Sequence, residues 1–126
     1  MSAAENAAKM RVALKAVKGR LDRAEALLAD VIGAIRDHSE EVRECAALLA
    51  QTPFLDGEEP GFAAFADRRR AALKARIAAL NAALKSLYKD EITRRADVER
   101  YLRQKISLED AADAAKGEAA RARAKR

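Results

Sequence analysis

Apolar residues recur between residues 10 and 49 in steps of four and three that alternate without a break. The series is Met10, Leu14, Val17, Leu21, Ala24, Leu28, Val31, Ile35, His38, Val42, Cys45 and Leu49. Charged residues occupy many of the intervening positions. A heptad pattern sustained over this length is typical of a coiled coil. We therefore predict a helix over about residues 4–50, with Ser2 and Glu5 forming a capping box at its start.

A second series with the same spacing follows Pro60. Its positions are Ala66, Leu73, Ile77, Leu80, Leu84, Leu87, Glu91, Arg94, Val98, Tyr101, Lys105 and Leu108. The first half is apolar, but Glu91 and Arg94 interrupt the middle. Large apolar residues lie beside the seam there, namely Tyr88, Ile92, Leu102 and Ile106. This pattern indicates an apolar stripe that drifts sideways, so the supercoil unwinds locally or the helix buries a wider face.

The segment between the two series has a different composition. Residues 48–70, "LLAQTPFLDGEEPGFAAFADRRR", contain both prolines and all three phenylalanines of the chain. Neither helix can bury its apolar stripe alone, so we interpret residues 51–61 as a hairpin turn and not as a linker between domains. Placing Leu49 near Ala66 pairs Val42 with Leu73.

The predicted fold class is all-α, an antiparallel two-helix coiled coil in which the second helix is longer. One domain, residues 1–126, holds helix 1 (about 4–50), the turn (51–61), helix 2 (about 61–118) and a basic tail (119–126). In this register helix 1 ends early, so we expect about the last 15 residues of helix 2 to be unpaired.

The composition agrees with this fold and bears on the cellular location of the protein. Hydrophobic residues make up 50% of the 126 residues, but most of them are alanine, and charged residues make up 36%. Such a chain favours long helices packed along seams over a globular core. Cys45 is the only cysteine, so an intrachain disulfide is impossible. With neither a signal-peptide core nor a membrane-spanning stretch in the sequence, we expect a cytoplasmic protein.

Charge is mildly basic and unevenly distributed. The net charge is +5, and residues 61–126 carry 17 basic against nine acidic side chains. This asymmetry suits nucleic acid, an anionic membrane surface or an acidic protein partner, and does not choose among them. We do not expect nucleic-acid binding, because it would favour more net charge and aromatic residues interleaved for stacking.

The sequence carries no pattern of catalytic chemistry. It has no glycine-rich phosphate loop, no Cys/His metal spacing and no Ser/His/Asp set. His38 and Cys45 both occupy the first seam, where packing is the expected role. Asp56, Glu58 and Glu59 lack the spacing of a calcium loop and are interpreted as solvated turn acids. We expect no enzyme activity, no metal, no cofactor and no small-molecule substrate.

Two features near the turn are candidates for binding. Basic residues cluster at the start of helix 2 as Arg68, Arg69, Arg70, Lys74 and Arg76. The phenylalanines Phe54, Phe62 and Phe65 lie beside them. These rings either cap the turn or form an exposed apolar patch with a basic rim, which would mark a protein-binding site. The sequence leaves both alternatives open.

The second half of the chain resembles a known family. Residues 61–105, "GFAAFADRRRAALKARIAALNAALKSLYKDEITRRADVERYLRQK", are similar to the FliJ family of flagellar type III export stalk proteins, which are related to the YscO-type proteins of injectisomes. The similarity comprises the aromatic, basic and leucine-rich start of helix 2 and the charged stretch beyond. Helix 1 matches only by its periodicity.

The resemblance implies a stalk that links a hexameric export ATPase ring to the export gate, handles export chaperones, and meets the membrane only through its partners. At the gate end, it implies contacts from Phe62, Phe65, Arg69, Ala72 and Arg76. At the ATPase end, it implies contacts from Met10, Arg11, Leu14, Tyr101, Lys105, Arg121, Arg123, Lys125 and Arg126. The alternatives are a generic coiled-coil adaptor or scaffold and, after it, a basic nucleic-acid-binding helical protein.

Overall fold

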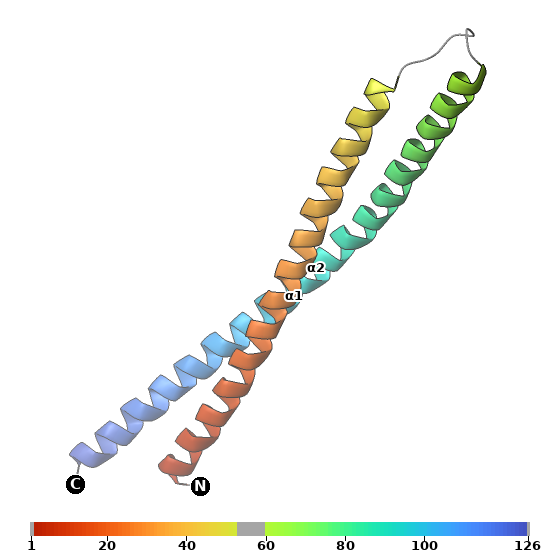
Figure 1. The fold of residues 1–126 in the computed structure, drawn as a ribbon. Coiled ribbons are helices and arrows are strands. Elements are labelled where there is room, and N and C mark those ends of the chain that lie inside the picture. Colours follow the sequence, from red (N-terminus) through yellow and green to blue (C-terminus); the bar gives the residue numbers. More distant parts are fainter. Residues whose placement is uncertain (1, 53–59, 126) are drawn as a thin grey trace. The chain divides into compact units, whose positions relative to one another are not determined.

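Two long helices make up the part of the chain that is described by the computed structural model, residues 2–52 and 60–125. Helix α1 spans Ala3–Gln51 and helix α2 spans Pro60–Ala124, and no strand occurs in these ranges (Figure 1). The helices pack against each other and α2 is the longer, which confirms the predicted all-α antiparallel hairpin. The chain divides into two compact units, each containing part of both helices.

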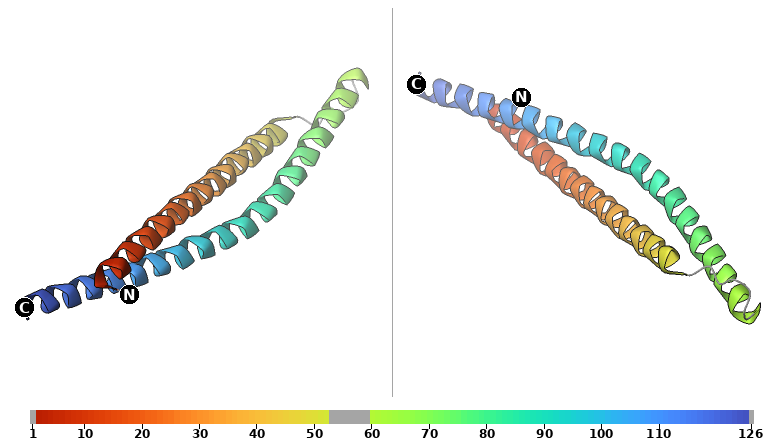
Figure 2. Two further views of the ribbon diagram at one scale, coloured as in Figure 1. Left: turned by 90° about the horizontal axis from the view of Figure 1, so that it is seen from below. Right: turned by 90° about the horizontal axis from the view of Figure 1, so that it is seen from above.

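Unit 2, residues 30–91, contains the end of α1 and the start of α2. The two segments run antiparallel, with the yellow end of α1 and the green start of α2 at the same end of the unit (Figure 2). Among its described residues, the buried apolar side chains are Cys45, Ala66, Leu80 and Leu84. These are seam positions of both helices, as the heptad spacing predicts. Leu80 is the most completely buried of them, with 2% of its surface exposed.

An ion pair crosses between the two helices of unit 2. Arg76 donates from Nε and Nη2 to Glu41 Oε1 at 2.8 and 2.6 Å. The expected register sets Glu41 opposite residue 74, so its observed partner lies two residues further along α2. The contact thus places the two helices close to the expected register.

Unit 1, residues 1–29 and 92–126, contains the start of α1 and the end of α2. Val17, Leu21 and Ala24 of α1 are its buried apolar side chains among the described residues. The α2 seam opposite them is only half-buried and includes Arg94 and Lys105. At the N-terminus, the Glu5 amide donates to Ser2 Oγ at 3.2 Å, which confirms the Ser2 half of the predicted capping box.

The prediction that α2 buries a wider face in this region is wrong. The half-buried positions continue in steps of three and four through Glu91, Arg94, Val98, Tyr101 and Lys105, so the seam stays in place although charged residues interrupt it. The large apolar residues beside the seam stay exposed, as with Ile92 at 70%. The reason is that a single partner helix covers only one narrow face of α2.

The end of α2 also differs from the expectation. Residues 119–124, expected to be part of a basic tail, are helical, because alanine and arginine are among the best helix formers. The prediction that about the last 15 residues are unpaired is wrong for part of this segment. Ala115, Ala119 and Ala122 share a hollow with Ala3 and Ala7 of α1.

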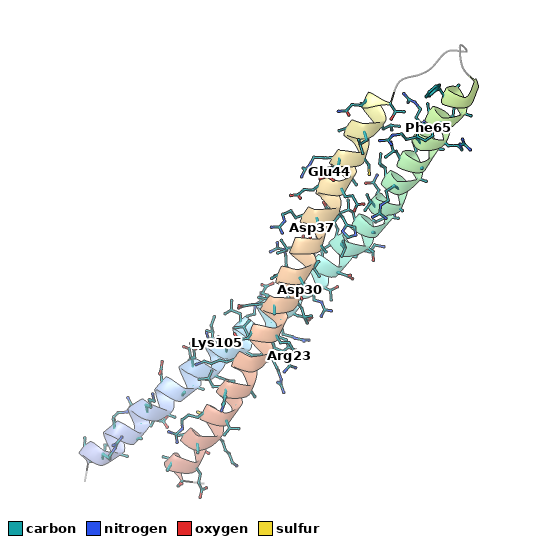
Figure 3. All side chains as sticks on the ribbon, in the orientation of Figure 1. Arg23, Asp30, Asp37, Glu44, Phe65 and Lys105 are labelled. Atoms are coloured by element: carbon teal, nitrogen blue, oxygen red, sulfur yellow. The ribbon has the colours of Figure 1, made fainter. Side chains whose placement is uncertain are left out.

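The side of α1 that faces away from its seam is charged. In unit 2, Asp30, Asp37 and Glu44 recur every seven residues and are exposed along α1 (Figure 3). This arrangement gives α1 the polar outer face of an amphipathic helix. Among the described residues, no helix is long and apolar enough to cross a membrane.

Candidate protein-binding surface at the hairpin end

The end of α1 is closed by hydrogen bonds that its own sequence and α2 supply. The Thr52 amide donates to the Leu48 carbonyl oxygen at 3.0 Å, and Thr52 Oγ1 donates to the same oxygen at 2.8 Å. Arg70 of α2 donates from Nη2 to the Thr52 carbonyl. The last turn of α1 has no basic residue. A guanidinium from the opposite helix therefore takes the place of the cation that usually complements a helix C-terminus.

Beside this closed end lies an open hollow of about 350 Å³, with both helices contributing to its wall. We call it the hairpin-end surface, and it consists of Leu48, Gln51, Thr52, Phe62, Phe65, Ala66 and Arg69. Ala66 and Thr52 are buried and form its floor, whereas Leu48 is 40% exposed. The wall is mainly apolar, with one guanidinium at its edge.

The two described phenylalanines are exposed. Phe62 has 60% and Phe65 59% of its surface accessible, and Figure 3 places Phe65 near the start of α2. Their positions explain this exposure: Ala66 and Arg70 occupy the seam, so Phe62 and Phe65 fall on the flank of α2. The sequence left two alternatives for the phenylalanines, a cap on the turn or an exposed apolar patch. The exposed fractions of Phe62 and Phe65 agree with the exposed patch. Phe54 lies outside the described residues.

Three of the five residues expected at the gate end meet on this surface: Phe62, Phe65 and Arg69. Ala72 is exposed further along α2. Arg76 is engaged with Glu41, and the side chains of this pair are 54% and 39% exposed. The sequence did not indicate the contribution of Leu48, which lies one residue before the seam position Leu49, nor the role of Arg70 at the end of α1.

The residues expected at the ATPase end fall into two groups. Arg11 and Arg123 line an open hollow of about 670 Å³ in unit 1, together with Lys116, which sequence reasoning missed. Arg121 and Lys125 are exposed nearby along the chain. Arg126 lies outside the described residues.

Four further candidates for the ATPase end belong to the seam. Met10, Leu14, Tyr101 and Lys105 are half-buried. Tyr101 lines a smaller hollow of about 130 Å³ with Arg94, and its hydroxyl accepts a hydrogen bond from Arg100 at 2.9 Å. Lys105 Nζ lies 3.7 Å from Glu109 Oε1. These side chains contribute to packing within unit 1, and the structure does not gather them into one surface with the basic residues.

The two residues with potential reactivity pack in the seam. His38 is half-buried, and its Nδ1 lies 2.8 Å from the Ala34 carbonyl oxygen, which fits an Nδ1–H donor. Cys45 is buried and not in a disulfide. Within residues 2–52 and 60–125, no group of three His, Cys, Asp or Glu side chains is arranged to hold a metal ion.

Comparison of the chain with models of protein families, with characterised proteins and with solved structures finds no match.

Proposed function

We propose that this protein is a non-enzymatic adaptor that binds a protein partner through the hairpin-end surface. The observation that carries the proposal is the exposure of Phe62 and Phe65, 60% and 59%, in a chain with only five aromatic residues. Exposed aromatic rings beside an open apolar hollow and an arginine are the usual composition of a protein-binding centre. The hollow is open to solvent and both helices contribute to it, which suits contact with a protein partner.

The sharper form of the proposal is a cytoplasmic stalk of a flagellar or related type III export apparatus. It rests on the resemblance of residues 61–105 to the FliJ family, a segment that includes Phe62, Phe65 and Arg69. In this role the hairpin-end surface contacts the export gate. The basic end of unit 1, with Arg11 and Arg123, contacts the hexameric export ATPase. Export chaperones are a third class of partner.

A generic coiled-coil scaffold is the second candidate, and the same surface supports it with different partners. A nucleic-acid role is less favoured, because many basic side chains are engaged with acids of the same chain. Arg76 pairs with Glu41, Arg103 with Glu99 and Lys105 with Glu109. Each such pair lowers the positive charge that a phosphate backbone would meet.

The test uses purified components: the chain, the cytoplasmic domain of the export gate protein and the export ATPase of the same organism. Calorimetry or surface plasmon resonance should give a saturable interaction with the gate domain. Replacing Phe62 and Phe65 together by alanine should weaken it by about 30-fold or more, since buried aromatic anchors dominate such interfaces. Binding to the ATPase should be unchanged.

The matched control is Val12→Ala, which trims an apolar side chain that is 72% exposed in unit 1. It should bind the gate domain like the wild type. No binding to the gate domain or to the ATPase would refute the export stalk. Equal binding by the double phenylalanine variant and the wild type would refute the role of the hairpin-end surface.

A further inference from the structure

Unit 1 carries a second apolar stripe that α1 does not cover. Ile92, Leu102 and Ile106 of α2 are 70%, 42% and 49% exposed. Arg95 and Glu99 are exposed between them, and the five positions follow one another in steps of three, four, three and four. On a helix this spacing places all five side chains on one face. That face is separate from the half-buried seam of α2, which includes Arg94, Val98 and Lys105.

The stripe is complementary to itself when reversed. Its first four positions, Ile92, Arg95, Glu99 and Leu102, are symmetric about residue 97. An antiparallel copy of the same helix therefore sets Ile92 against Leu102 and Arg95 against Glu99, each contact occurring twice. Self-complementarity of one patch about a two-fold axis is the requirement for a symmetric dimer.

We propose that two copies of this chain associate through this face of α2, antiparallel, with Ile92 on Leu102 and Arg95 on Glu99. The charges on this face favour a second copy of the chain as the partner, and they favour an antiparallel orientation of its helix. A parallel copy would set Arg95 on Arg95 and Glu99 on Glu99, which is unfavourable, whereas the antiparallel copy pairs opposite charges at both positions. Glu99 already accepts a hydrogen bond from Arg103 of its own helix, and its carboxylate has further acceptor sites for Arg95 of the partner copy.

One helical face with a few apolar layers is a small interface, so the dimer is weak and reversible. A dissociation constant on the order of 10–100 μM is expected for an interface below the standard size. Sedimentation equilibrium over a concentration series should show the mass rising from 13.7 kDa toward twice that value. The inference stands apart from the proposed function, because the phenylalanines of the hairpin end take no part in it.

Charge reversal tests the pairing. Arg95→Glu alone and Glu99→Arg alone each bring like charges together and should raise the dissociation constant by about tenfold or more. The double variant Arg95→Glu/Glu99→Arg restores opposite charges and should dimerise like the wild type. An equimolar mixture of the two single variants should form a mixed dimer more tightly than either forms alone. Circular dichroism at low concentration checks that each variant keeps its helix content.

Cysteine pairing tests the direction, in a Cys45→Ala background. A mixture of Ile92→Cys and Leu102→Cys chains should form an interchain disulfide on mild oxidation, whereas either variant alone should form much less. Preferential crosslinking within the single variants would overturn the antiparallel arrangement.

Three other results would overturn the dimer itself: a mass that stays at 13.7 kDa to millimolar concentration, no rescue by the double variant, or unchanged association in Ile92→Ser. Val12→Ser, which removes an exposed apolar side chain of α1, serves as the matched control and should dimerise normally.

Discussion

Leu80 offers the sharpest test of the packing, because it is the most completely buried side chain of unit 2, with 2% of its surface exposed. Replacing it by alanine removes three buried carbon atoms and leaves a void in the seam. Substitutions of this kind cost about 2–5 kcal/mol in compact cores. In a two-helix layer the opposite side chains can move into part of the void. We therefore expect a loss of unfolding free energy in the lower half of this range, about 2–3 kcal/mol.

The matched control is Leu102→Ala, which removes the same atoms from a side chain that is 42% exposed. It should change the stability by less than about 0.5 kcal/mol, because alanine also has a slightly better helix propensity. For a domain of this size, Leu80→Ala should lower the melting temperature by roughly 10 °C. Circular dichroism at 222 nm, recorded at low micromolar concentration, provides the measurement.

Equal melting temperatures for Leu80→Ala and Leu102→Ala would refute the reasoning, since they would mean that Leu80 is not enclosed by α1. If Leu102→Ala lowered the melting temperature more than Leu80→Ala, the true seam of α2 would lie on the other face of the helix.

Three further predictions concern the helices and their ends. Gly33→Ala should stabilise the protein by about 0.8–1 kcal/mol in thermal melts, because an added Cβ meets nothing within 4 Å and alanine favours the helix. Arg70→Ala should cost about 1–2 kcal/mol by removing the charged donor to the Thr52 carbonyl, whereas the exposed Arg68→Ala should be nearly neutral. In a Cys45→Ala background, Glu41→Cys/Arg76→Cys should be joined within one chain by a short bis-maleimide, and a product only between chains would contradict the hairpin.

The sequence predicts the hairpin well because its main signal is local and repeated. The apolar steps of three and four on both sides of residues 51–61 determine two helices with one narrow seam each. Pro60 marks the start of α2, since proline suits the first turn of a helix. These features depend on backbone geometry and on burial of a stripe, both of which can be inferred from residue order.

Which faces of α2 stay exposed is harder to predict from the sequence, because it depends on how much of α2 the partner helix α1 covers. Ile92 and Ile106 have the residue type of a core, and only the continuous polar seam through Arg94 and Lys105 shows that they lie outside it. Arg70 belongs to a cluster of basic residues that the sequence alone would place in solvent, yet its guanidinium donates to the Thr52 carbonyl at the end of α1. Such contacts join residues that are distant in sequence and carry no periodic signal.

The measurement that tests the central claim most directly is site-specific photocrosslinking in living cells. A photoreactive phenylalanine analogue at position 65 replaces an exposed aromatic residue of the hairpin-end surface. The same analogue at position 12 of α1 provides the control. We predict a defined adduct from position 65 that mass spectrometry identifies as the export gate protein, and no such adduct from position 12. The absence of an adduct at position 65, or the same adducts at both positions, would contradict the account.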